Sequence, residues 1–206
     1  MTSVRFPGKV LAPLCGRPVI AHVLGQVQAV VPAQRIAVAT SLEPSDDPLA
    51  GYVERLGISV FRGSLDDVVD RFQRCLLAYP CEWFFRVCAD SPFLDATLAH
   101  RFLAESAAPG VDLVTNIWPR RTFPHGQSLE LVRSSTFAGL NSAELSPEER
   151  EHVTHVYYRY PQRFRIVSVA AADPSASDLR LSVDVPEDLE RLREYAAGSR
   201  AAAEAR

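Results

Sequence analysis

Residues 82–90 have the sequence EWFFRVCAD, an almost continuous apolar run that ends on an aspartate. A strand that is buried on both faces of a sheet reads in this way, whereas a strand with one solvated face alternates apolar and polar residues. We therefore expect this segment to lie at the centre of a sheet that helices cover on both sides.

Strand-like and helix-like segments alternate on either side of this run. The segments expected to be strands are 35–40, 58–61, 111–116, 127–132, 163–170 and 178–184. The segments expected to be helices are one that starts near Arg17–Pro18, then 64–79 with Ser64 as N-cap, about 95–107, 146–160 with a capping box at Ser146 and Glu149, and 186–197. This alternation predicts an α/β fold with a mixed sheet, mainly parallel in its first half, and helices on both faces. Neither a repeat nor a linker interrupts it, so we expect one domain over residues 1–197 and a disordered tail over 198–206.

The overall composition excludes several classes of protein. With 206 residues, of which 47% are hydrophobic, the chain is able to bury a full core. A formal net charge of −3 argues against a nucleic-acid-binding protein, and no apolar run is long enough to span a membrane. There is no signal peptide, and the four cysteines form no CxxC pair, which predicts free thiols and a cytoplasmic location. His152 and His155 are three residues apart but have no further ligands nearby, so zinc is not expected.

Lys9 is the only lysine among the 22 Lys and Arg residues, and it follows Pro7-Gly8. Where arginine supplies every other basic side chain, a single lysine suggests a site that needs a compact ammonium group. Gly8 permits close approach of the backbone to a ligand, Arg5 and Lys9 bracket it with positive charge, and a helix follows. These are the parts of a phosphate-binding site. An ordinary basic turn before a helix would give the same local pattern.

Two aspartates stand at the carboxyl ends of expected strands, which is where ligands bind in doubly wound sheets. Asp90 ends the run 82–90, and Asp184 ends 178–184 just before a helix. If they converge near Lys9, the two carboxylates suit Mg²⁺, which takes few protein ligands and shares the rest of its shell with water and phosphates. The alternative is that each aspartate only caps the helix that follows it.

Taken together, the motifs resemble those of the sugar-nucleotide cytidylyltransferases, and in particular the spore-coat polysaccharide biosynthesis protein F-type members. The family shows a loop S-x-R-L-P-G-K followed by L-x-G-R-P, a block R-G-S-x-D-D-V-x-D-R-F, a strand end A-D-x-P-x-x-D, a helix E-R-E-H-V-T and a closing V-D-x-P-E-D-L. The matching positions in this chain, in the same order, are 3–9 with 14–18, 62–72, 89–95, 149–154 and 183–189.

The resemblance implies a Rossmann-like nucleotide-diphospho-sugar transferase fold, and transfer of CMP from CTP to a sugar or sugar-acid acceptor with release of pyrophosphate. Carried over to this sequence, it places Arg5, Gly8 and Lys9 at the triphosphate, Arg62, Gly63 and Ser64 near the nucleoside, and Asp90 and Asp184 on Mg²⁺. Arg5 and Lys9 would be the catalytic cations. It is also compatible with a homodimer, for which 146–160 is the candidate surface, and with a role in polysaccharide or glycoconjugate biosynthesis.

The sequence departs from the family pattern at two functional points. Met1 falls inside the first family loop, so the first central strand, and an arginine that the family uses at the nucleotide, are expected to be missing. On the acceptor side, the family's Asp-Gly-x-Asp-x-Glu reads His125-Gly126-Gln127-Ser128-Leu129-Glu130. We therefore expect an acceptor other than the usual one, with Arg120, Arg121 and His125 as candidates for binding an anionic group. A solvated basic turn is the alternative. We take Arg121, His125, Glu130 and His152 as the candidate acceptor-binding residues.

Two other functions stay open at this point. A non-catalytic nucleotide-sugar-binding module would retain the ligand contacts without turnover, and the missing strand favours it. A GT-A-type glycosyltransferase would usually show an Asp-x-Asp metal motif, but the sequence around Asp90 is Ala-Asp-Ser. A dinucleotide-dependent dehydrogenase is not favoured, because no GxGxxG follows a strand.

Overall fold

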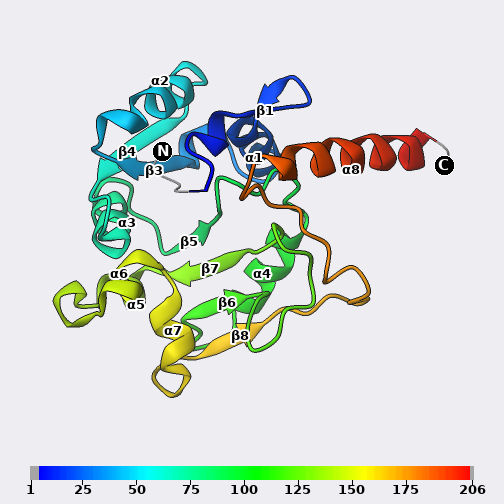
Figure 1. The fold of residues 1–206 in the computed structure, drawn as a ribbon. Helices are drawn as coiled ribbons and strands as arrows, with labels where there is room; N and C mark the ends of the chain where they lie inside the picture. The colour runs from blue at the N-terminus through cyan, green and yellow to red at the C-terminus, as the bar shows by residue number, and fades with distance from the viewer. Residues whose placement is uncertain (1–4, 205–206) are drawn as a thin grey trace.

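The computed structural model describes residues 5–204 of the chain, with side chains up to residue 199 (Figure 1). Its main sheet has four strands in the order β5 (Trp83–Arg86), β7 (Glu130–Arg133), β6 (Leu113–Thr115) and β8 (Ile166–Ser168). β7 runs antiparallel to both of its neighbours, and β6 and β8 are parallel. A separate parallel pair is formed by β3 (Ala37–Ser41) and β4 (Ser59–Gly63), and β1 (Pro13–Leu14) and β2 (Arg17–Pro18) form a short hairpin. The sheet is thus mixed, as expected.

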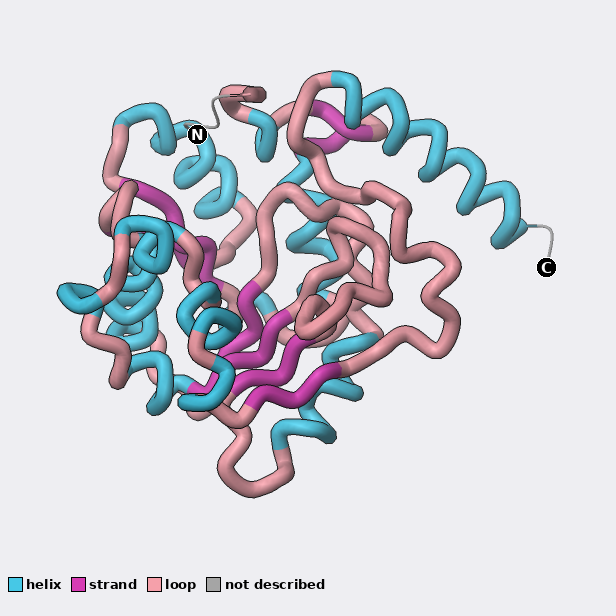
Figure 2. The backbone as a smooth tube through the Cα atoms, turned by 60° about the horizontal axis from the view of Figure 1, so that its bottom comes forward, coloured by secondary structure: helices cyan, strands magenta, loops and turns pink. Residues whose placement is uncertain are grey.

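Helices cover both faces of the four-stranded sheet (Figure 2). On one face, α4 (Leu98–Ser106) packs Phe102 against Val114 of β6 and Leu131 of β7. Side chains alternate along a strand, so Leu113 and Val132, each next to a residue of the first cluster, point to the opposite face. There they pack with α3 (Val68–Ala78), α5 (Ser134–Ala138) and α7 (His155–Arg159). The short helix α6 (Pro147–Glu151) packs against α3.

The parallel pair β3–β4 has its own helical cover. Apolar residues of α1 (Val19–Gln28) and α2 (Asp47–Arg55) form a cluster with Ile36 and Ile58, which lie at the starts of the two strands. The hairpin β1–β2 joins a further cluster with the closing helix α8 (Glu187–Glu204), which projects from the body of the molecule in Figure 1. One-turn 3₁₀ helices connect these elements at Lys9–Leu11, Ala33–Arg35, Pro44–Asp46, Ser142–Glu144 and Pro161–Arg163.

β3 and β5 are each paired on one side only, with β4 and β7 respectively, and no described strand lies between them. The run 82–90, expected at the centre of a sheet, therefore supplies an edge strand of the described four-stranded sheet, and residues 83–90 are half-buried rather than fully buried. The missing first strand expected from the sequence remains a prediction, because residues 1–4 lie outside the described part of the chain.

Three expected elements differ from the structure. The helix expected over 146–160 is broken between α6 and α7, where His152 is extended (φ −105°, ψ 96°) and the chain steps inward to bury Thr154. The strand expected over 178–184 is reduced to a single parallel bridge between His125 and Arg180. The helix expected from Ser64 starts later, because Asp67 is its N-cap and accepts a hydrogen bond from the Asp70 amide.

At the end of the chain, α8 continues to Glu204, beyond the boundary at 197 expected from the sequence, and residues 205 and 206 are outside the described part. No helix among the described residues is both long enough and apolar enough to cross a membrane.

Candidate active site at Lys9, Asp90 and Asp184

The loop before α1 aims Lys9 inward. Gly8 adopts a left-handed conformation (φ 75°), which glycine tolerates best, and its carbonyl accepts a hydrogen bond from the Leu11 amide at 2.9 Å. The sharp turn at Gly8 begins the short 3₁₀ helix Lys9–Leu11. The Lys9 side chain is therefore 16% exposed, while Arg5 on the other side of the turn is 69% exposed.

Lys9 bridges the two aspartates that the sequence singled out. Its Nζ lies 2.6 Å from Oδ2 of Asp90 and 3.2 Å from Oδ1 of Asp184, and Arg5 Nη2 lies 3.3 Å from the same Asp184 oxygen. Burial disfavours the charged form of Lys9, but the hydrogen bonds and charges of both carboxylates outweigh burial and raise its pKa. At neutral pH, Lys9 is thus protonated, and the two carboxylates fix its ammonium group in position.

Backbone contacts keep the two aspartates together. The Val183 amide donates to the Asp90 carbonyl at 2.9 Å, which ties the segment before α8 to the end of the 82–90 run. Asp188 in the first turn of α8 accepts hydrogen bonds from the amides of Asp184 and Val185 at 2.6 and 3.0 Å. Asp188 therefore fixes the backbone that leads into α8, and the Asp184 carboxylate faces Lys9.

The donor chemistry of this pair fits Mg²⁺. Two carboxylates converge on the point where the Lys9 ammonium now lies, and carboxylate oxygen is the ligand type that Mg²⁺ prefers. Among the described residues, no group of three or more His, Cys, Asp or Glu side chains is arranged to hold a metal ion. Two carboxylates suffice only for an ion that completes its shell with water and phosphate oxygens, as Mg²⁺ does.

The turn expected near the nucleoside lies at the carboxyl ends of β3 and β4, where the Leu42 amide donates to the Gly63 carbonyl. Neighbouring protein groups hold the partly exposed Arg62 guanidinium: it donates to the carbonyls of Ser41 and Glu43, both at 2.9 Å, and pairs with Asp47 at 2.6 Å. The Arg62 side chain thus supports the turn. Contact between this turn and a nucleoside remains a prediction.

A cavity of about 260 Å³ is lined by two of the expected acceptor-binding residues, Glu130 and His152. Glu130 is 1% exposed and is held by Nη1 of Arg86 at 3.2 Å, by the Thr154 hydroxyl at 2.7 Å and by the Tyr158 hydroxyl. Burial and the Glu130 charge raise the pKa of Tyr158, so the phenol stays protonated and donates. Glu130 is thus fixed by protein donors and shapes the wall of the cavity.

Sequence reasoning missed most of the lining of this cavity, including the polar side chains of Arg86, Thr154 and Tyr158. Arg86 had a detectable signal, since it is the one charged residue inside the apolar run 83–89. The other two had none, because the break between α6 and α7 sets which way they face.

Cys88 connects the cavity to the Lys9 cluster. It is half-buried; burial raises its pKa, and its thiol also senses the charges of Arg86 and Glu130 as well as those of Asp90 and Lys9. Arg86 of the cavity and Asp90 of the Lys9 cluster are also only four residues apart on the same segment, so the two sites are neighbours.

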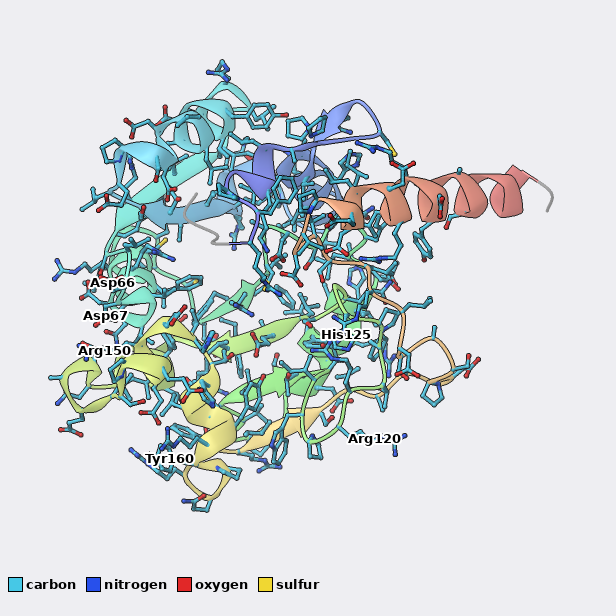
Figure 3. The ribbon with its side chains drawn as sticks, viewed as in Figure 1. Asp66, Asp67, Arg120, His125, Arg150 and Tyr160 are labelled. Atoms are coloured by element: carbon cyan, nitrogen blue, oxygen red, sulfur yellow. The ribbon has the colours of Figure 1, made fainter. Side chains whose placement is uncertain are left out.

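Arg121 and His125 come from the loop that connects β6 to β7. Arg121 is half-buried, donates to the Ser128 hydroxyl at 2.8 Å and senses the charge of Glu130. His125 lies away from the cavity and next to Arg180: burial lowers its pKa, and the positive charges of Arg121 and Arg180 lower it further. Arg120 is exposed and lies at the outer end of the loop, away from His125 (Figure 3).

Comparison with known proteins adds independent information. A family model described as cytidylyltransferase matches residues 1–198. The spore coat polysaccharide biosynthesis protein SpsF of Bacillus subtilis is 28% identical over 199 residues, which cover 94% of this chain and 81% of that protein.

Two solved structures share the fold. A cytidylyltransferase from Leptospira borgpetersenii superposes with a TM-score of 0.87 at 26% identity, over 94% of this chain and 81% of that one. The structure of a CMP:2-keto-3-deoxy-manno-octonic acid synthetase complexed with CTP gives a TM-score of 0.68 at 18% identity, over 96% and 95% of the two chains. The nucleotide-diphospho-sugar transferase fold expected from the sequence is confirmed.

Proposed function

The chain belongs to the cytidylyltransferase family, and from this premise we propose that it transfers CMP from CTP to a sugar or sugar-acid acceptor and releases pyrophosphate. The observation that carries the proposal is the ammonium group of Lys9, held between Asp90 and Asp184 beside the exposed Arg5. The Bacillus subtilis relative supports a role in polysaccharide biosynthesis.

In this reaction, an acceptor oxygen attacks the α-phosphorus of CTP, and the bond to the pyrophosphate oxygen breaks. Negative charge develops on the non-bridging and leaving oxygens, so groups that are already oriented and positive lower the barrier. Lys9 is kept charged and immobile by its two carboxylates, and Arg5 is free to turn toward a phosphate because it is mostly exposed. Both cations are thus suited to stabilise the triphosphate in the transition state.

Asp90 and Asp184 would hold Mg²⁺ together with phosphate oxygens of CTP. When bound, the ion would supply further positive charge to the phosphates. The same two carboxylates keep Lys9 protonated, and Lys9 has hydrogen bonds to both. Loss of either aspartate would therefore weaken Lys9 as well as the metal site.

The acceptor would bind in the cavity that adjoins the Lys9 cluster. His152 offers a hydrogen-bonding group for sugar hydroxyls, and Glu130 keeps the Arg86, Thr154 and Tyr158 side chains of the cavity wall in place. Arg121, from the loop between β6 and β7, supplies positive charge for a carboxylate or phosphate. The CTP complex of the 2-keto-3-deoxy-manno-octonic acid synthetase supports a sugar acid as the acceptor class. His125 would act from the same loop, on the side nearer to Arg180.

The test is pyrophosphate release from CTP, Mg²⁺ and a panel of sugar acids and phosphorylated sugars. We expect turnover by the wild type and its loss in Lys9→Ala and Asp90→Ala, with the fold retained by circular dichroism. Tight CTP binding without turnover on any acceptor would identify a binding module instead. Release of a nucleoside diphosphate from a ready-made sugar nucleotide would identify a glycosyltransferase.

A further inference from the structure

A second cavity, of about 130 Å³, lies beside Asp184, and it is lined by the arginines Arg5, Arg180 and Arg191. Its two acidic residues are already neutralised. Asp184 pairs with Lys9 and Arg5, while Asp188 pairs with Arg191 at 2.5 Å and accepts two backbone amides. Within the described residues, no hydrogen bond or ion pair engages the exposed Arg180 guanidinium. Arg180 is therefore a positive charge available to a ligand.

The chain holds Arg180 in place through its backbone. The His125 amide donates to the Leu179 carbonyl at 2.9 Å, and the Leu181 amide donates to the His125 carbonyl at 2.6 Å. Paired residues of a bridge project to the same side, so the Arg180 and His125 side chains share one face. The depression of the His125 pKa by the Arg180 charge agrees with this closeness.

We propose that Arg180 is a phosphate-binding residue that, together with Arg5, holds the pyrophosphate end of the nucleoside triphosphate and the pyrophosphate that leaves. This inference rests on the proposed function, because it names a further contact for the same substrate. Arg180 shares a cavity with Arg5 and Asp184, and is not among the residues around the acceptor-side cavity of Glu130. The planar fork of arginine also matches two phosphate oxygens at once.

The experiment measures inorganic pyrophosphate binding by calorimetry with Mg²⁺ present, in the wild type, Arg180→Gln, Arg180→Lys and Arg35→Gln. Arg35 is the matched control, because it is exposed and lies at the end of a one-turn 3₁₀ helix away from both cavities. A lost charge-assisted hydrogen bond weakens binding roughly 10- to 150-fold, which is the expected change in Arg180→Gln. Lysine should restore part of it, and the control should bind like the wild type.

Steady-state kinetics give a second measurement. Arg180→Gln is expected to raise KM for CTP and to leave KM for the acceptor unchanged. An unchanged pyrophosphate Kd in Arg180→Gln would overturn the inference, and so would an increase confined to the acceptor KM. A different result would contradict the proposed function: a wild type that binds pyrophosphate but turns over no acceptor. In that case, pyrophosphate binding by the Arg180 variants would still decide whether Arg180 binds phosphate.

Discussion

Gly126 is the residue on which docking of the acceptor-side loop depends, and Gly126→Ala tests this directly. Gly126 has φ +93°, and a Cβ added there would lie 2.5 Å from the carbonyl carbon of Leu181 and 2.7 Å from the Ser182 amide nitrogen. Both neighbours are backbone atoms, which cannot turn aside as a flexible side chain does. The loop must therefore either keep a strained conformation or dissociate from residues 179–182.

The loss in free energy of unfolding is set by whichever of these two responses requires less free energy. Holding an L-residue at this φ costs on the order of 1–3 kcal/mol before the overlap is added. Releasing the loop loses the two hydrogen bonds between His125 and residues 179 and 181, at about 0.5–1.5 kcal/mol each. We therefore expect the free energy of unfolding to fall by about 1–3 kcal/mol, which for a chain of this size lowers Tm by about 2–12 °C.

Gly25→Ala is the matched control. Gly25 lies in α1, is exposed, and a Cβ there would meet nothing within 4 Å. Alanine in a helix interior is favoured over glycine by about 0.5–1 kcal/mol, so this variant should be more stable than the wild type. Urea titration and thermal melting measure both variants, and KM for the acceptor should rise in Gly126→Ala, because the loop carries Arg121 and His125. A Gly126→Ala protein as stable as the wild type would refute the reasoning.

Four further expectations follow from the geometry. In the pyrophosphate-release assay, Lys9→Ala should lower kcat by roughly 10²–10³-fold, as loss of one oriented stabilising donor does, and Lys9→Arg should recover little of this loss. A folded Lys9→Ala enzyme with normal turnover would contradict a catalytic role for Lys9. Tyr158→Phe removes a donor to the buried Glu130, so urea unfolding should show a loss of about 1.5–3 kcal/mol, and an unchanged stability would mean that the phenol does not support this carboxylate. Asp188 has a lowered pKa, because its hydrogen bonds with Arg191 and two backbone amides outweigh its burial, so its contribution to stability is present above its unfolded pKa of about 3.9 and is lost as pH falls. The difference in free energy of unfolding between wild type and Asp188→Asn should therefore shrink between about pH 5 and 2, and a constant difference would rule this out. Adding an apolar strand before residue 1 should raise the urea midpoint above that of the 206-residue chain, because β3 and β5 each have one unpaired edge in the described structure; equal midpoints would show that these edges do not take up a strand.

Much of the fold was predictable because it depends on local patterns. The apolar run 82–90, the acidic first turn before α3 and the Pro-Glu-Asp start of α8 each correspond to an element of the structure. The predictions of helices and strands were wrong where a tertiary contact overrides the local pattern. The periodicity of 146–160 is helical, yet the helix breaks at His152, where Thr154 turns in to donate to Glu130.

The candidate site shows the same division. Lys9 stood out by its rarity, and Asp90 and Asp184 by their positions at strand ends, and the structure brings these three side chains together. Arg62 was expected near the nucleoside, but its guanidinium is held by Ser41, Glu43 and Asp47. An arginine in a turn looks the same in sequence whether its partner is a ligand or a neighbouring carbonyl.

The sequence by itself determined the α/β class, the family and the residue types of the Lys9 cluster, because periodicity, strand-end aspartates and motif order are properties of short segments. Only the tertiary structure decided that Glu130 is buried among Arg86, Thr154 and Tyr158, that Asp188 binds the amides of Asp184 and Val185, and that Arg180 and Arg5 line one cavity. These residues are distant in the chain, and their roles depend on which charge or amide each one meets. That is settled by packing between segments, which no local pattern records.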